Sequence, residues 1–252
     1  MPETPVLVER RGAVALITLN RPQRRNAINA ALSQGFCDAV AASQDARCIV
    51  ITGADPAFCA GLDLKELGVG TLAELPSYAG ALADSNVPLI AAVNGAAVTG
   101  GFEIALGCDF IVASDRAVFA DTHVRVGVYP GPVLVDLPRR VGMAFAREMS
   151  MTGNFVDAAT ALRVGLANHV KRHDELLPFA LALAEAIADA DPAMIAAMRR
   201  DWDANWGTPL ADARRIHRDH AIAGGFGRNT GTDIAGRRET VLARSRVQRG
   251  TG

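Results

Sequence analysis

The sequence has almost no net charge, few aromatic residues and only two lysines. Its 252 residues carry 26 Lys and Arg against 27 Asp and Glu, so the formal net charge is -1. This balance supplies no long-range field to attract a polyanion, and we expect no nucleic acid among its partners. Because Lys65 and Lys171 are the only lysines, nearly all the positive charge is carried by arginine.

Cysteine motifs and long apolar runs are also missing. The four cysteines, Cys37, Cys48, Cys59 and Cys108, form no C-x-x-C pair, and none has a histidine near enough in sequence for a zinc knuckle. We therefore expect buried, reduced thiols and no metal site. No run of about 18 apolar residues is present, and the first residues lack an apolar signal core. The sequence thus predicts a cytoplasmic protein without a membrane span.

Short apolar runs alternate with helical patterns along the chain. Branched apolar runs predict strands at 13–19, 48–52, 89–93 and 110–113, a three- and four-residue spacing predicts a helix at 26–42, and 66–86 reads as a loop with some helix. The last third, from about residue 176, has helical patterns alone. Such alternation is typical of an α/β fold with largely parallel strands. The length fits one large domain with an extension.

Two segments, 57–65 and 93–105, carry glycines between a predicted strand and helix-forming sequence. Backbone N–H groups at a helix start lack partners there, so each turn suits a phosphate, a carboxylate or an oxyanion. Neither segment matches G-x-G-x-x-G or G-x-x-x-x-G-K-S/T, which argues against a nucleotide fold. Spacing alone leaves open that Gly100 and Gly101 only allow close packing of helix on strand.

An ordered set of motifs over residues 14 to about 170 resembles the enoyl-CoA hydratase/isomerase (crotonase) superfamily. The motifs are N-R-P at 20–22, N-A-I-N at 26–29, A-F-C-A-G-L-D-L-K at 57–65, V-N-G-A-A-V-T-G-G-F-E at 93–103, C-D at 108–109, F-A-D-T-H at 119–123 and G-x-x-P-G at 127–131. Each piece is weak by itself, whereas the combination in this order is highly specific.

The resemblance implies an α/β spiral of repeated ββα units over residues 1–190. It implies that residues 191–252 form a C-terminal helical region through which the chain assembles as a homotrimer, or as a hexamer made of two trimers. It also implies an acyl-CoA substrate, with coenzyme A as part of that substrate and no separate cofactor.

By the resemblance, the backbone N–H groups of Leu62 and Gly100 form an oxyanion hole. Adding water to an enoyl thioester, or removing its α-proton, places negative charge on the thioester oxygen, and one preset N–H donor is worth about 3 to 4 kcal/mol. Glu103, in the first turn of the predicted helix, matches the acid/base of the family. The residue pattern alone also fits a carboxylate that favours the helix dipole.

His123 departs from the family pattern. The hydratases of the family carry a second glutamate at the position that His123 occupies. A neutral imidazole accepts a proton near neutral pH but does not reproduce a pair of carboxylates. We predict that His123 has a secondary role in holding water or substrate, with Asp121 as a candidate partner for its ring; the alternative is that His123 fills a pocket wall.

The resemblance also places the contacts to coenzyme A. These are Arg24, Ala60, Leu62, Asp63, Leu64, Lys65 and Gly100. Taken as residues alone, Asp63 fits a role in fixing the local turn, and Arg24 fits a solvated loop.

The sequence therefore predicts an acyl-CoA-processing enzyme, a lyase that adds or eliminates water at an enoyl-CoA through a stabilised thioester enolate. Because His123 replaces the second glutamate, three alternatives stay open. Two are enzymatic on the same fold, namely thioester hydrolysis and C–C cleavage. The third is non-catalytic binding of an acyl-CoA.

Overall fold

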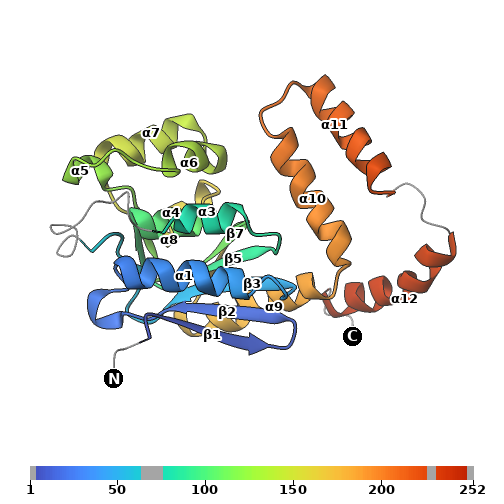
Figure 1. The fold of residues 1–252 in the computed structure, drawn as a ribbon, viewed down its shortest axis with the longest axis horizontal. Coiled ribbons are helices and arrows are strands. Elements are labelled where there is room, and N and C mark those ends of the chain that lie inside the picture. Colours follow the sequence, from blue (N-terminus) through green and yellow to red (C-terminus); the bar gives the residue numbers. More distant parts are fainter. Residues whose placement is uncertain (1–3, 64–75, 226–230, 249–252) are drawn as a thin grey trace. The chain divides into compact units, whose positions relative to one another are not determined.

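The computed structural model describes residues 4–63, 76–225 and 231–248, with 231–236 and 247–248 described by their backbone only. The chain divides into two compact units, Met1–Pro192 and Ala193–Gly252. Figure 1 shows the order of their elements along the chain.

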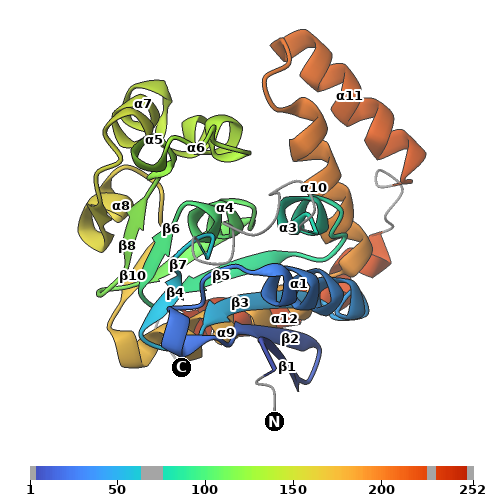
Figure 2. The same ribbon diagram turned by 60° about the vertical axis from the view of Figure 1, so that its left-hand side comes forward.

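Two sheets build the first unit (Figure 2). The larger sheet has the strand order β1 (Val6–Arg11), β2 (Val14–Leu19), β3 (Cys48–Gly53), β5 (Leu89–Val93), β7 (Phe110–Ser114) and β10 (His169–Lys171). The smaller has the order β4 (Ala57–Cys59), β6 (Ala96–Val98), β8 (Val118–Ala120) and β9 (Val156–Asp157). Apart from β1 and β9, which pair antiparallel with β2 and β8, the described strands run parallel.

From β3 to β8, consecutive strands alternate between the two sheets. Each of β3, β5 and β7 lies in the larger sheet and is followed by β4, β6 or β8 in the smaller one, before the chain enters the next helix. The helices of this unit are α1 (Ala30–Ala42), α3 (Tyr78–Ala83), α4 (Gly100–Leu106), α5 (His123–Val126), α6 (Val133–Val141), α7 (Met143–Thr152), α8 (Ala158–Arg163) and α9 (His173–Ala188), with a 3-10 turn η1 (Pro22–Arg24). This is the predicted spiral of ββα units.

The parallel strands are apolar on both faces because helices cover both. One row across the sheet, Ile17, Ile51, Ala91 and Ile111, belongs to the core shared with α1 and α4. The alternate positions, among them Val50 and Ile90, pack against Leu176, Ala180, Leu181 and Ala184 of α9. A continuous apolar run is what a strand buried on both faces requires. Each large side chain so buried contributes about 1.5 to 3 kcal/mol.

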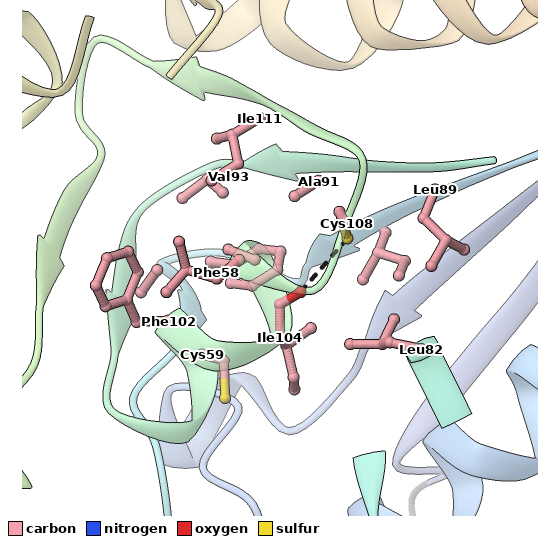
Figure 3. Packing of buried hydrophobic residues seen from close by; sticks show 14 of the residues in the cluster. Phe58, Cys59, Leu82, Leu89, Ala91, Val93, Phe102, Ile104, Cys108 and Ile111 are labelled. Carbon is pink, nitrogen blue, oxygen red and sulfur yellow. Dashed lines mark hydrogen bonds between the residues drawn. The ribbon is translucent and has the colours of Figure 1, made fainter. Parts of the chain in front are cut away.

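Helix α4 lies inside the first core, and every one of its residues is buried. Figure 3 shows Phe102 and Ile104 of this helix among side chains that include Phe58 of β4 and Val93 of β5. The Ile104 carbonyl accepts a hydrogen bond from the Cys108 thiol at 3.4 Å. Because α4 packs against strands of both sheets, the helix start at Gly100 is fixed with respect to both.

The structure agrees with four predicted strands to within one residue at either end, as β2, β3, β5 and β7. The helix predicted over 26–42 begins only at Ala30, because Asn26 has a φ of 56° and the side chain of Asn29 caps the helix by accepting from the Leu32 N–H. The predicted loop at 66–86 contains α3, and its residues 66–75 lie outside the described part. Strands β4, β6, β8 and β9 are two or three residues long and show no periodicity in the sequence.

The second unit consists of helices in its described part. They are α10 (Pro192–Asn205), α11 (Leu210–Ala223) and α12 (Gly231–Gln248). None of the residues of α10 and α11 is buried within the chain. Across the described part of the whole chain, the helices are all too short or too polar to cross a membrane.

The loop before α1 is held by the fully buried side chain of Asn26. Its amide nitrogen donates to the carbonyls of Ala54, Ala57 and Phe58 at 2.8, 2.7 and 3.1 Å, and its carbonyl oxygen accepts from the Arg21 N–H at 2.9 Å. This one residue therefore ties the loop to the start and body of β4.

We expect Asn26→Ala to lower the free energy of unfolding by about 3 kcal/mol, because several buried backbone groups lose their partner at once. Chemical denaturation followed by circular dichroism measures the change. The control is Asn154→Ala, at an exposed residue, which should shift stability by no more than about 0.5 kcal/mol. Equal effects of the two substitutions would contradict the role given to Asn26.

Candidate active site

The two glycine segments predicted from the sequence lie against each other in the structure. A Cβ atom on Gly61, which has a φ of +86°, would stand 1.9 Å from the hydroxyl oxygen of Thr99 and 2.8 Å from the Val98 carbonyl. Only a residue without a side chain permits this approach. The segment after β4 and the start of α4 therefore form one continuous backbone surface.

The N–H of Leu62 points away from the strand-like bridge that Leu62 makes with Ile28. In that bridge the Ile28 N–H donates to Gly61 O at 2.7 Å, and the Ile28 carbonyl accepts from the Asp63 N–H at 2.9 Å. In a parallel bridge, the residues on either side of Leu62, here Gly61 and Asp63, make both hydrogen bonds to Ile28. The N–H of Leu62 itself therefore points to the opposite side. Leu62 thus offers a donor to whatever lies there.

The N–H of Gly100 is the first of helix α4, and the first N–H groups of a helix have no partner inside it. Thr99, immediately before, has a φ of 46° and a ψ of -116°. Positive φ is strained for a β-branched residue, and such strain is often found at functional sites. The assignment of Leu62 and Gly100 as oxyanion donors stays a prediction.

Glu103 lies in the first turn of α4 and is only 5% exposed. Its Oε1 accepts from the Gly131 N–H at 3.1 Å, and its Oε2 lies 2.7 Å from the hydroxyl of Tyr78. Three segments that are distant in sequence therefore meet at one carboxylate. A carboxylate has about four acceptor positions, so the two contacts leave Glu103 able to accept a further hydrogen bond.

Tyr78 was not predicted from the sequence as a site residue. It lies on α3, inside the weakly patterned segment 66–86, and its partner is 25 residues away. Burial, the charge of Glu103 and the hydrogen bond to Glu103 together raise the pKa of the Tyr78 hydroxyl far above its ordinary value. The hydroxyl therefore stays protonated and donates to Glu103. The one signal available in the sequence was that Tyr78 is one of only two tyrosines.

His123 is buried at the start of α5, and its Nδ1 lies 2.6 Å from Oδ1 of the buried Asp121. Asp121 follows the last residue of β8, so the turn after the strand lets the two side chains meet. Burial opposes charge on the imidazole, but the hydrogen bond with Asp121 and the charges of Glu103 and Asp121 outweigh it and raise the pKa of His123. The predicted partnership of Asp121 with His123 is present.

The residues predicted to contact coenzyme A have different surroundings. Arg24 is exposed on η1, and Ala60 is half-buried next to the glycine turn, where its N–H donates to the Arg25 carbonyl at 3.0 Å. Asp63 is buried and pairs with Arg21 at 3.3 Å, which suits a residue that fixes the turn. Leu64 and Lys65 lie outside the described residues.

The two histidines of α11 share a single carboxylate. His217 and His220 both hydrogen bond through Nδ1 to Asp201 of α10. Within the described residues no group of three or more His, Cys, Asp or Glu side chains is arranged to hold a metal ion. We therefore assign this cluster to the charged surface of the helical unit.

Comparison with known proteins identifies the family of the chain. A family model described as enoyl-CoA hydratase/isomerase matches residues 9–229. A probable enoyl-CoA hydratase of Rhizobium meliloti is 44% identical over 192 residues, which cover 73% of this chain and 75% of that protein. A carnitinyl-CoA dehydratase of Proteus mirabilis is 39% identical over 224 residues, covering 84% and 85%.

Solved structures give the same result for the fold. An enoyl-CoA hydratase from Mycobacterium avium superposes with a TM-score of 0.72 at 42% sequence identity, covering 88% of this chain and 99% of that one. The residues matched by the family model, 9–229, include both glycine segments. The chain therefore belongs to the enoyl-CoA hydratase/isomerase family.

Proposed function

We propose that this enzyme adds water reversibly to an enoyl-CoA, with Glu103 as the base and protonated His123 as the acid. Membership of the family makes the chain an acyl-CoA-processing enzyme of the hydratase type. The observation that carries the proposed roles is the buried Glu103 carboxylate in the first turn of α4, with the Asp121–His123 pair close enough for the charge of Glu103 to raise the pKa of His123.

The backbone donors act on the thioester. As water adds to the double bond, electron density moves to the thioester oxygen, and the N–H groups of Leu62 and Gly100 stabilise the resulting enolate. Because both donors belong to backbone that is fixed by close packing, no reorganisation is needed when the charge develops.

Proton movement follows from the two side chains. Water attacks the β-carbon and passes a proton to Glu103, while the α-carbon of the enolate takes a proton from the imidazolium of His123. The Asp121 carboxylate holds Nδ1 of the ring, so Nε2 is the atom that delivers the proton. The proton on Glu103 then returns to His123 through solvent, which restores both groups.

Hydration is favoured over the alternatives of thioester hydrolysis, C–C cleavage and non-catalytic binding. The relatives reported above are named as a hydratase and a dehydratase, and neither name supports those alternatives. The Asp–His pair supplies an acid at the position where the family's hydratases carry their second glutamate, so replacement of that glutamate does not remove the function.

Glu103→Gln should lower kcat/KM for a panel of enoyl-CoA thioesters by about 100-fold to 10,000-fold, since it removes a general base. Hydration is followed by loss of the enoyl absorbance, with chromatographic analysis of the products. His123→Gln should also lower kcat, whereas His123→Glu, which restores a carboxylic acid, should retain hydration.

The matched control is Glu185→Gln, at an exposed residue of α9, which should leave kcat/KM unchanged within about twofold. Full activity of a folded Glu103→Gln protein would overturn the role of Glu103. Release of free coenzyme A in place of a hydrated product would favour thioester hydrolysis, and tight binding without turnover in every variant would favour a non-catalytic protein.

The rate should depend on pH through His123. Since the pKa of His123 is raised, the imidazolium persists above the ordinary value of about 6.5 and is lost as the pH rises through the raised pKa. Activity should therefore fall on the alkaline side. Asp121→Asn removes contributions that raise this pKa and leaves burial, which lowers it, so the alkaline limb of the kcat profile should move to lower pH. An unchanged limb would argue that His123 is not the acid.

For coenzyme A, we propose contacts from the chain around the glycine turn, with Arg24, Ala60, Asp63, Leu64 and Lys65 supplementing Leu62 and Gly100. Exposed Arg24 suits a phosphate, whereas the pairing of Asp63 with Arg21 indicates an indirect role for that carboxylate. Coenzyme A enters as part of the substrate, and the proposed reaction needs no further cofactor.

We further propose that the second unit assembles the chain into a homotrimer or a hexamer, and that the protein is cytoplasmic. Trp202 and Trp206 are 61% and 58% exposed, and Ile222 is 68% exposed, so this unit presents apolar side chains that a partner subunit would bury. The four cysteines of the protein are free thiols, as is typical of a reducing compartment.

Sedimentation equilibrium should give three or six times the mass of 26.5 kDa. Trp202→Glu should shift the protein toward monomers, because a charge on the proposed contact surface disfavours its burial. A monomeric wild-type protein would contradict this assembly without affecting the roles of Glu103 and His123.

A further inference from the structure

A tyrosine contacts the Glu103 carboxylate directly. Tyr78 lies in the first turn of α3, and its hydroxyl is 2.7 Å from Oε2 of Glu103. The residue is partly buried, with its ring packed against the core that contains Phe102 and Ile104. The contact therefore joins α3 directly to the acid/base of α4.

The position of the hydroxyl depends on Gly100. A Cβ atom placed on Gly100 would stand 2.9 Å from the Tyr78 hydroxyl oxygen and 3.0 Å from the Ile28 methyl. The missing side chain at 100 thus makes room for the phenol as well as for a thioester. The Tyr78 hydroxyl thus lies close both to Gly100 and to the Glu103 carboxylate.

The element that carries Tyr78 is anchored on both sides. The fully buried Ser33 of α1 donates to the Pro76 carbonyl at 2.7 Å, and the Ser77 hydroxyl caps α3 by accepting from the Gly80 N–H at 2.9 Å. These bonds fix the direction in which the tyrosine leaves the backbone. A side chain held in this way presents its hydroxyl with little loss of conformational entropy.

A carboxylate that acts as a base is effective only when it is held at the correct angle to the reacting water. In the family's hydratases a second glutamate shares the task of orienting that water, whereas this chain has His123 at the corresponding position. Glu103 is held here by Gly131 on one oxygen and Tyr78 on the other. Both clamps leave acceptor positions for the water.

We propose that Tyr78 is a positioning residue for the hydration, whose hydroxyl clamps Oε2 of Glu103 and so orients the carboxylate toward the water at the oxyanion turn. The proposal rests on the proposed function of Glu103 as base. Tyr78 acts through Glu103 and takes no proton in the reaction.

Tyr78→Phe removes only the hydroxyl and keeps the ring in the core. We expect kcat to fall about tenfold to hundredfold, the usual consequence of losing one hydrogen bond to a charged group in an active site, while KM changes by less than about twofold. The matched control is Tyr129→Phe at the other tyrosine, which is 87% exposed and should leave kcat unchanged. Thermal unfolding and far-ultraviolet circular dichroism of both variants should match those of the wild type.

A double-mutant cycle with Glu103→Gln separates positioning from a purely structural effect. If Tyr78 acts through Glu103, adding Tyr78→Phe to Glu103→Gln should lower the residual kcat no further. The proposal would be overturned if the two substitutions lowered kcat additively, or if Tyr78→Phe alone left kcat at the wild-type value. In that case Glu103→Gln still decides the proposed function independently, because its loss of activity does not depend on Tyr78.

A spectroscopic titration tests the contact without any substrate. In Tyr129→Phe, Tyr78 is the only tyrosine, and because its pKa is raised the ultraviolet absorbance of tyrosinate should appear only above the range of an ordinary tyrosine, about 10. Adding Glu103→Gln, which removes the carboxylate charge, should let Tyr78 ionise at lower pH. Ionisation of Tyr78 in the ordinary range with Glu103 intact would overturn the proposed clamp.

Discussion

Direct packing of backbone against backbone, between the segment after β4 and the start of α4, is the constraint on which the site depends. A Cβ atom on Gly101 would stand 2.2 Å from the Cys59 carbonyl oxygen, so any side chain at 101 would separate the helix from the strand. Asn26 reinforces the same region from the other side by bonding to the carbonyls of Ala57 and Phe58. This contact determines the direction of the chain in the two turns. It therefore also determines where the N–H groups of those turns point.

The proposed chemistry would use that rigid frame in two ways. In the proposal, backbone groups provide a fixed positive potential at the thioester oxygen, and side chains on the frame provide proton transfer. Glu103 comes from the same helix as Gly100, which fixes the distance between the proposed base and the proposed oxyanion turn. His123 comes from the following ββα unit, where Asp121 holds the ring. One repeat of the spiral thus carries the proposed oxyanion turn and base, and the next carries the proposed acid.

The sequence predicted the parts of the fold and site that depend on local patterns. The four main parallel strands were recognisable because strands buried on both faces are continuously apolar, and the motifs around Gly100 and Glu103 have a fixed spacing. The three-residue strands β4, β6 and β8 were missed because they are too short to show a period. The direction of the Leu62 N–H is set by a bridge to Ile28, and the Tyr78 contact is set by a helix in a weakly patterned segment, so neither follows from nearby residues. Asp121 was named as a candidate partner of His123, and the two side chains meet because β8 ends at Ala120 and the chain turns after it.

The meeting of three segments at Glu103 has a consequence for how the enzyme becomes active during folding. Tyr78 precedes Glu103 by 25 residues, and Gly131 follows it by 28, so the carboxylate is fully held only after elements from successive repeats of the spiral have docked. A chain that has formed its strands but has not closed these loops leaves the base free to rotate in solvent. In the proposed mechanism, the base is therefore in place only when contacts from three separate segments have formed.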